Sequence, residues 1–221
     1  MSDTGIGARV LRKEDRRFLT GKGRYTDDVN LTGQAYAYFV RSPHAHATIK
    51  KIDTTAAKSA PGVLGVFTGD DVANSKIGGL ICGWMIHSKD GSPMKAGPHP
   101  VLAQGKVRYV GDHVAVVVAE TKALAKAAAA LVQVTYQELP AVIDMREAVK
   151  PGAAQVHEVA PNNTVYNWHI GDEAATKAAF SKAAHVTRVD LVNNRLIPNA
   201  MEPRAAVGSY DAGDDHFTLY T

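Results

Sequence analysis

Residues 112–136 read DHVAVVVAETKALAKAAAALVQVTY and carry the strongest structural signal of the chain. Val114 to Ala119 is an unbroken apolar run, which is typical of a strand covered on both faces. Glu120-Thr121 can cap the alanine-rich helix that follows over 122–131, and 132–136 has the composition of a second strand. The sequence therefore predicts a strand–helix–strand unit within an α/β (α+β) fold class.

Shorter elements are expected before this unit. Runs rich in aromatic and β-branched residues predict strands over 34–40, 47–52 and 63–67. Asp53 is a candidate N-cap for a helix over 54–59, and residues 68–71 begin a second helix that reaches Asn74. Residues 75–100 are rich in glycine and proline and predict a long surface loop, a kind of segment that is often functional or packs on a partner.

The chain beyond residue 140 is expected to form a second part. Residues 140–161 predict a connector with a domain boundary near residue 150. Asp172 begins a helix to Lys182, strands are expected over 185–192, 205–210 and 216–221, and Gly213-Asp214-Asp215 forms a hairpin turn. Because no helix follows to cover this sheet, we expect residues 1 to about 140 to fold and 150–221 to be loosely structured.

Composition limits the classes of function. The 25 basic and 22 acidic residues give a net charge of +3, too small to indicate nucleic-acid binding. A single cysteine excludes an internal disulfide framework and a cysteine-ligated iron–sulfur cluster, which needs about four thiolates. No run approaches the roughly 20 apolar residues of a membrane span, and the first ten residues lack the apolar region of a secretory signal. A cytoplasmic protein is the expectation.

The first 20 residues are basic. Arg9, Arg12, Lys13, Arg16 and Arg17 lie close together, and this cluster can hold a phosphate, a nucleic acid or an acidic partner. A solvated arm that lies on a neighbouring surface is the more common role of such a segment.

Metal and nucleophile motifs are weak in this chain. His44 and His46 can chelate as a pair but have no third or fourth ligand nearby, so a structural or interface role is favoured. Cys82, His87 and His99 share the long loop at irregular spacing, which argues against a zinc site. An activated thiol at Cys82 needs a positioned base that sequence does not reveal. No phosphate-binding glycine loop and no G-x-S-x-G elbow occurs.

The carboxylates point to capping rather than acid–base chemistry. Asp27-Asp28, Asp70-Asp71 and Asp214-Asp215 are adjacent pairs in turns, where such side chains point apart. Glu202 and Arg204 flank a proline, which favours an ion pair that fixes a bend over a substrate-binding role. The residues alone therefore predict no catalytic, cofactor-binding or metal-binding residue in this chain.

Five segments, taken in order, resemble the large, molybdenum-binding subunit of the xanthine dehydrogenase/aldehyde oxidase family, most closely its carbon monoxide dehydrogenase-like bacterial branch. They are LRKEDRRFLTGKGRYTDD (11–28), RSPHAHA (41–47), GVLGVFTGDD (62–71), VRYVGDHVA (107–115) and NRLIPNAMEPR (194–204). The resemblance implies an N-terminal arm over 1–19, an a/b hammerhead domain over 20–140, a linker over 141–160, and an incomplete N-terminal part of a molybdopterin-binding domain over 161–221.

The resemblance also implies a reaction. Such enzymes oxidise or hydroxylate an aldehyde, an N-heterocycle or CO with water-derived oxygen at a molybdenum centre, assisted by a glutamate base. In the family, the glutamate, a glutamine near the cofactor and a glycine-rich loop lie beyond the segments matched here, so Glu202 is not that base and no site residue is transferred. This chain is therefore expected to be inactive alone.

The resemblance finally implies cofactors and partners. Molybdenum–molybdopterin cytosine dinucleotide is expected on the rest of the large subunit, FAD on a medium subunit and [2Fe–2S] clusters on a small subunit, in a dimer of heterotrimers. The basic arm and the long loop are candidate docking surfaces. The alternative is a non-catalytic hammerhead module for interaction or assembly.

Overall fold

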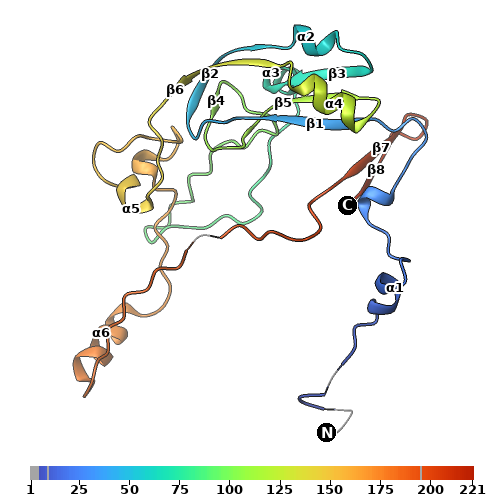
Figure 1. Ribbon diagram of the computed structural model, residues 1–221. Helices are drawn as coiled ribbons and strands as arrows, with labels where there is room; N and C mark the ends of the chain where they lie inside the picture. The colour runs from blue at the N-terminus through green and yellow to red at the C-terminus, as the bar shows by residue number, and fades with distance from the viewer. Residues whose placement is uncertain (1–4, 9, 195) are drawn as a thin grey trace. The chain divides into compact units, whose positions relative to one another are not determined.

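The computed structural model describes residues 5–8, 10–194 and 196–221 (Figure 1). Its internal contacts divide the chain into two compact units. The larger unit comprises residues 35–187, and the smaller unit comprises the residues up to 34 together with 188–221. Each unit is described by itself.

Two antiparallel sheets form the larger unit. In the first sheet, β5 (His113–Ala119) lies between β1 (Tyr36–Arg41) and β3 (Val63–Thr68). In the second sheet, β2 (Ala47–Asp53) lies between β4 (Lys106–Val107) and β6 (Gln133–Glu138). The elements of the predicted strand–helix–strand unit are thus confirmed, but its two strands belong to different sheets.

Helix α4 (Lys122–Ala129) covers the first sheet. Its N-cap is Thr121, whose hydroxyl accepts the backbone N–H of Leu124 at 3.2 Å. The helix packs on β1 and β5 through alanines, and Ala125, Ala128 and Ala129 are buried. Because the buried residues of the helix are all alanines, the helix can lie close to the sheet, and Val117 of β5 is fully buried beneath it.

Two short helices connect the strands. Helix α2 is Thr55–Lys58 and α3 is Gly69–Asn74, close to the predicted positions. The N-cap of α2 is Thr54 rather than the expected Asp53, whose carboxylate instead accepts the N–H of Thr55 at 3.1 Å. At the start of α3, a Cβ on Gly69 would lie 2.2 Å from the carbonyl oxygen of Ala103, so only glycine fits there.

A second cluster of buried residues joins the two sheets. Val114 of β5 packs with Val107 of β4 and Ala47 of β2, and all three are fully buried. Tyr136 of β6 packs against this cluster from the side. The apolar run at 114–119 therefore serves two cores, which explains why it has no polar alternation.

The expected loop over 75–100 is confirmed, since its described residues form no helix or strand apart from one isolated bridge between His87 and Pro93. Backbone hydrogen bonds nevertheless hold it in place. The N–H of Leu80 donates to the carbonyl of His99 at 2.8 Å, and the N–H of Lys95 donates to Val165 at 3.0 Å. The loop therefore lies against residues near 165, far away in sequence.

Residues 140–187 contain more structure than a connector needs. Helix α5 (Met145–Ala148) and a 3₁₀ turn, η2 (Pro161–Asn163), were not expected, whereas α6 (Glu173–Lys182) begins after Asp172 as predicted. The strand predicted over 185–192 is wrong, because these residues are extended but exposed and pair with no other described strand. A strand needs a partner to satisfy its backbone groups.

The smaller unit contains helix α1 (Asp15–Leu19), a 3₁₀ turn, η1 (Thr26–Asp28), and a hairpin of β7 (Val207–Asp211) and β8 (His216–Tyr220). The hairpin and its turn are confirmed. Arg9, part of the predicted basic cluster, and Arg195 lie outside the described residues. Across the described ranges, no helix has both the length and the apolar character needed to cross a bilayer.

Candidate functional site

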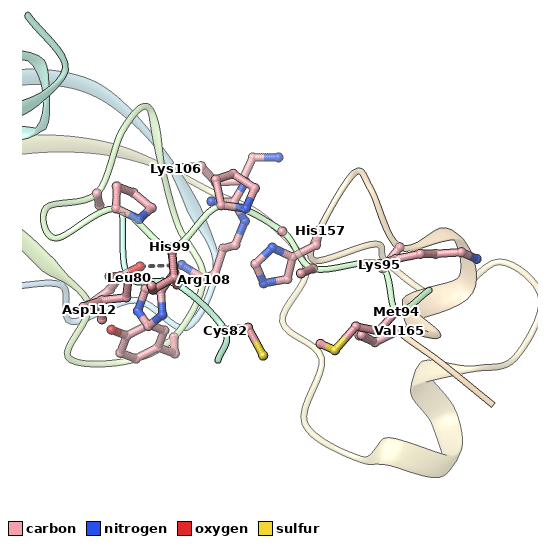
Figure 2. Close-up of a pocket in the computed structure, with 18 residues that line it drawn as sticks. Leu80, Cys82, Met94, Lys95, His99, Lys106, Arg108, Asp112, His157 and Val165 are labelled. Atoms are coloured by element: carbon pink, nitrogen blue, oxygen red, sulfur yellow. Dashed lines mark hydrogen bonds between the residues drawn. The ribbon is translucent and has the colours of Figure 1, made fainter. Parts of the chain in front are cut away.

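A cavity of about 480 Å³ lies in the larger unit and is the candidate site (Figure 2). The long loop forms one side of it and residues 157–165 form another, with β4 and the turn after it at its base. Its apolar lining residues are Leu80, Ile81, Met94, Ala96, Pro98, Pro100, Ala103, Ala160 and Val165. Its polar lining residues are Cys82, Lys95, His99, Lys106, Arg108, Tyr109, Asp112 and His157.

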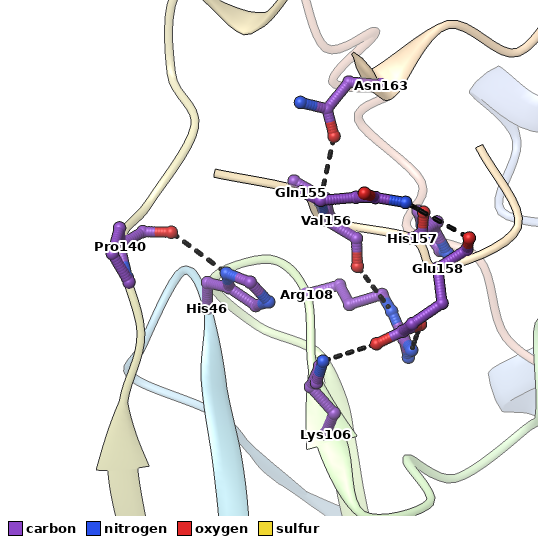
Figure 3. Close-up of polar contacts among 9 residues, drawn as sticks. All are labelled: His46, Lys106, Arg108, Pro140, Gln155, Val156, His157, Glu158 and Asn163. Carbon is purple, nitrogen blue, oxygen red and sulfur yellow. Dashed lines mark hydrogen bonds and ion pairs between the residues drawn. The ribbon is translucent and has the colours of Figure 1, made fainter. Parts of the chain in front are cut away.

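A small ion-pair network fixes the wall formed by residues 156–158 (Figure 3). The carboxylate of Glu158 pairs with Lys106 through one oxygen and with Arg108 through the other, at 3.0 Å from Nη2. Arg108 Nε also donates to the carbonyl of Val156 at 3.1 Å. The two cations hold the pKa of Glu158 at about 2, the hydrogen bond from Lys106 being the largest cause.

Asn163 holds the same segment from within. Its side-chain nitrogen donates to the carbonyls of Ala148 and Ala154, both at 2.9 Å, and its side-chain oxygen accepts the N–H of Val156 at 2.9 Å. Asn163 has a φ of 54°, a left-handed conformation that asparagine tolerates better than most residues. The wall of the cavity is therefore fixed by side-chain–backbone bonds rather than by regular structure.

Two titratable side chains of the cavity have shifted pKa values. Burial, and then the charge of Arg108, lower the pKa of His157, which favours the neutral imidazole at pH 7. Burial and the Asp112 carboxylate raise the pKa of Tyr109. Asp112 also accepts the backbone N–H of Arg108 at 3.1 Å.

The histidine pair lies beside the cavity rather than in it. His46 is 5% exposed, and its Nδ1 lies 2.9 Å from the carbonyl oxygen of Pro140 (Figure 3). His44 lies against the ring of Tyr136 and 3.5 Å from Glu138. The two imidazoles thus contact different partners, and this geometry suits a structural role.

The long-loop candidates are only partly brought together. Cys82 and His99 line the cavity, but His87 does not. The thiol of Cys82 is exposed and donates to the carbonyl of Trp84 at 3.3 Å. Throughout the described part of the chain, no group of three or more His, Cys, Asp or Glu side chains could hold a metal ion.

One aspartate of each adjacent pair accepts a hydrogen bond from a residue nearby in the sequence. Asp28 accepts the N–H of Tyr25 at 2.9 Å, Asp71 accepts that of Thr68 at 2.7 Å, and Asp215 accepts the hydroxyl of Tyr210 at 2.9 Å. The ion pair predicted between Glu202 and Arg204 is wrong. Both side chains are exposed, and the described residues contain no such pair, because neighbours across a proline can extend separately into solvent.

Sequence reasoning missed the residues that shape this site. Lys106 and Arg108 lie about 50 positions from Glu158, so no local pattern connects them. The sequence did contain a weak indication of a basic surface. Lys106 and Arg108 are both basic and lie two positions apart along β4 and its extension, which places them on one face.

The sequence pattern described as "Aldehyde oxidase and xanthine dehydrogenase, a/b hammerhead domain" matches residues 20–140. The chain belongs to the aldehyde oxidase and xanthine dehydrogenase family. A second pattern of this family's large subunits, described as "Molybdopterin cofactor-binding domain", matches residues 156–221. The predicted family and fold class are thereby confirmed.

Named relatives agree with this assignment. The chain is 36% identical to the carbon monoxide dehydrogenase large chain of Afipia carboxidovorans, covering 98% of this chain and 27% of the relative. It is 37% identical to the nicotine 6-hydroxylase large subunit of Paenarthrobacter nicotinovorans, covering 97% and 25%. The crystal structure of quinoline 2-oxidoreductase from Pseudomonas putida 86 superposes with a TM-score of 0.83 at 39% identity, covering 97% and 26%. The chain thus spans about a quarter of the length of these family members.

The described residues do not fit the metal groups that the family implies. Iron–sulfur clusters need about four thiolates, and the chain has one cysteine. Of the cations that line the candidate cavity, Lys106 and Arg108 are already paired with Glu158 and do not form a free site for a phosphate group. The described residues therefore supply no set of side chains for chemistry at these groups.

Proposed function

We propose that this chain is the N-terminal part of the large subunit of a molybdenum hydroxylase. The complete enzyme oxidises or hydroxylates an aldehyde, an N-heterocycle or CO with oxygen from water. The observation that carries the proposal is the match of two consecutive family patterns over 20–140 and 156–221, in a chain that covers about a quarter of its relatives.

The proposal assigns a scaffold role to these residues. The hammerhead domain over 20–140 folds around β5, residues 141–160 connect it, and residues 161–221 begin the molybdopterin-binding domain. The catalytic base and the cofactor-binding residues lie elsewhere in the large subunit, so residues 1–221 are inactive alone. The exposed hairpin and the unpaired stretch at 185–192 support this assignment, because such surfaces require further polypeptide to cover them.

Cofactors and partners are part of the same proposal. Molybdenum is carried as molybdopterin cytosine dinucleotide on the rest of the large subunit. Electrons pass to [2Fe–2S] clusters in a small subunit and to FAD in a medium subunit, within a cytoplasmic dimer of heterotrimers. Separate subunits for the clusters agree with the single cysteine of this chain.

Metal and pterin analysis of the native complex that contains this chain tests the proposal. We expect about one molybdenum and one pterin per large subunit in the complex, and neither in residues 1–221 purified alone. A complex without molybdenum would favour the alternative of a non-catalytic module. Molybdenum bound stoichiometrically by residues 1–221 would contradict the scaffold role.

A further inference from the structure

The cavity of Figure 2 has the size of a ligand site. Its volume of about 480 Å³ falls within the range of roughly 300–1,000 Å³ found for small-molecule pockets. Leu80, Met94, Pro98 and Val165 supply apolar walls from two segments far apart in the sequence. A flat apolar molecule would be in contact with both segments at once.

The two cations beside the imidazole of His157 are paired within the protein. Lys106 and Arg108 share the carboxylate of Glu158, and Asp112 accepts the backbone N–H of Arg108. Figure 2 shows the amine of Lys95 turned away from His157 and the other ring side chains. An anionic ligand would be repelled by Asp112 and would have to displace Glu158 from Lys106 and Arg108, and a cationic ligand would be repelled by these two cations. Burying a charge without a partner is costly, so the cavity disfavours both.

A neutral hydrogen-bonding group suits the polar end of the cavity. The half-buried imidazole of His157 projects toward the cavity between the loop and Arg108 (Figure 2). A neutral imidazole offers one donor and one acceptor, which matches an amide or a lactam. The lowered pKa described above favours this neutral form.

We propose that this cavity binds a small neutral molecule with a flat apolar body and one amide-like group, which hydrogen-bonds to His157. The proposal rests on the cavity and its charges and does not depend on the family assignment.

Three probes of one shape test the preference for a neutral ligand: benzamide, benzoate and benzylammonium. Each is titrated into the full 221-residue chain at pH 7, and the ring resonances of His157 are followed by NMR. We expect benzamide to shift them with a dissociation constant in the millimolar range, as suits a probe of this size. The two ions should bind at least about tenfold more weakly.

Substitutions at His157 test the hydrogen bond. His157→Phe keeps a ring but removes the polar atoms, and we expect the affinity for benzamide to fall about tenfold. His157→Gln keeps a donor and an acceptor and should bind within about threefold of the native chain. His169→Phe, an exposed histidine outside the cavity, should bind as the native chain does.

The probe comparison needs no variant, so a variant that misfolds leaves the proposal testable. Binding of benzoate or benzylammonium as tightly as benzamide would overturn it. So would the absence of any shift at His157 with about 10 mM benzamide. Equal affinities of the native and His157→Phe chains would likewise remove His157 from the site.

Discussion

The side chain of Asn163 holds the backbone of residues 148–156 in place. One side chain satisfies three backbone groups of residues 148–156. Its neighbour Asn162 has the same φ of 54° but makes no side-chain hydrogen bond within the described residues. Substituting each of these two asparagines in turn therefore distinguishes the contribution of the hydrogen bonds to stability from that of the left-handed backbone.

We expect Asn163→Ala to lower the free energy of unfolding by about 4 kcal/mol, because about 1 kcal/mol is lost for each of the three hydrogen bonds and alanine is strained by about 1 kcal/mol at this φ. Asn162→Ala incurs only the backbone strain and should cost about 1 kcal/mol. Urea denaturation of both variants measures the difference. Equal losses would show that the three hydrogen bonds contribute nothing net.

Glu158 predicts a pH dependence of stability. Its pKa is lowered to about 2 in the folded chain by Lys106 and Arg108, so its stabilising effect is fully present above the ordinary carboxyl pKa of 4.5 and is lost as the pH falls toward 2. Because the side chain is 64% exposed, solvent screens the pairs, and Glu158→Gln should cost only about 1 kcal/mol at pH 7.

Denaturation of Glu158→Gln and the native chain at a series of pH values checks this expectation, and the two curves should converge near pH 2. Glu147→Gln is the matched control, since Glu147 forms an ordinary exposed pair with Lys150. It should change stability by less than about 0.5 kcal/mol at any pH. A Glu158→Gln effect that persists at pH 2 would point to packing rather than charge.

At the scale of elements, α4 depends on its N-cap. Thr121 caps the helix through the N–H of Leu124, whereas Thr54 occupies the N-cap of α2 without a side-chain bond. Thr121→Ala should therefore cost about 1 kcal/mol, and Thr54→Ala should cost much less. Thermal unfolding followed by circular dichroism compares them. Similar shifts of the two melting temperatures would contradict the capping role.

Local patterns predicted elements well and their partners poorly. The apolar run at 114–119, the cap at Thr121 and the hairpin turn before β8 are local, and each was confirmed. That β5 and β6 join different sheets is set by pairing with β1, β3 and β2, which lie far away in sequence. The expected strand at 185–192 failed for the same reason, because apolar alternation cannot supply a partner.

The candidate site was harder to predict than the fold, because contacts between residues far apart in the sequence form it. Cys82 and His99 were singled out from the loop, but the pairing of Glu158 with Lys106 and Arg108 was not foreseen. The helix at 145–148 was missed because it is a single turn capped by Asp144 within a region rich in turn residues. Short helices rest on tertiary contacts more than on propensity.

At the scale of the whole molecule, buried side chains are concentrated in one part of the sequence. Buried side chains occur between residues 42 and 160, whereas the described residues from 161 onward are exposed or half-buried. Hydrogen exchange of the 221-residue chain should therefore protect β5 most strongly, protect 148–163 to an intermediate degree, and leave 185–221 nearly unprotected. Equal protection of β5 and β8 would contradict this expectation.

The alanine face of α4 has a consequence for how this sequence can vary. Ala128 and Ala129 meet the sheet with single methyl groups, in one buried cluster with Val66 and Val117. A larger residue on the helix must be matched by a smaller one on the strands, since the layer between them has no spare volume. Among natural variants of this chain, we expect these four positions to change in concert, each gain in bulk on one side answered by a loss on the other.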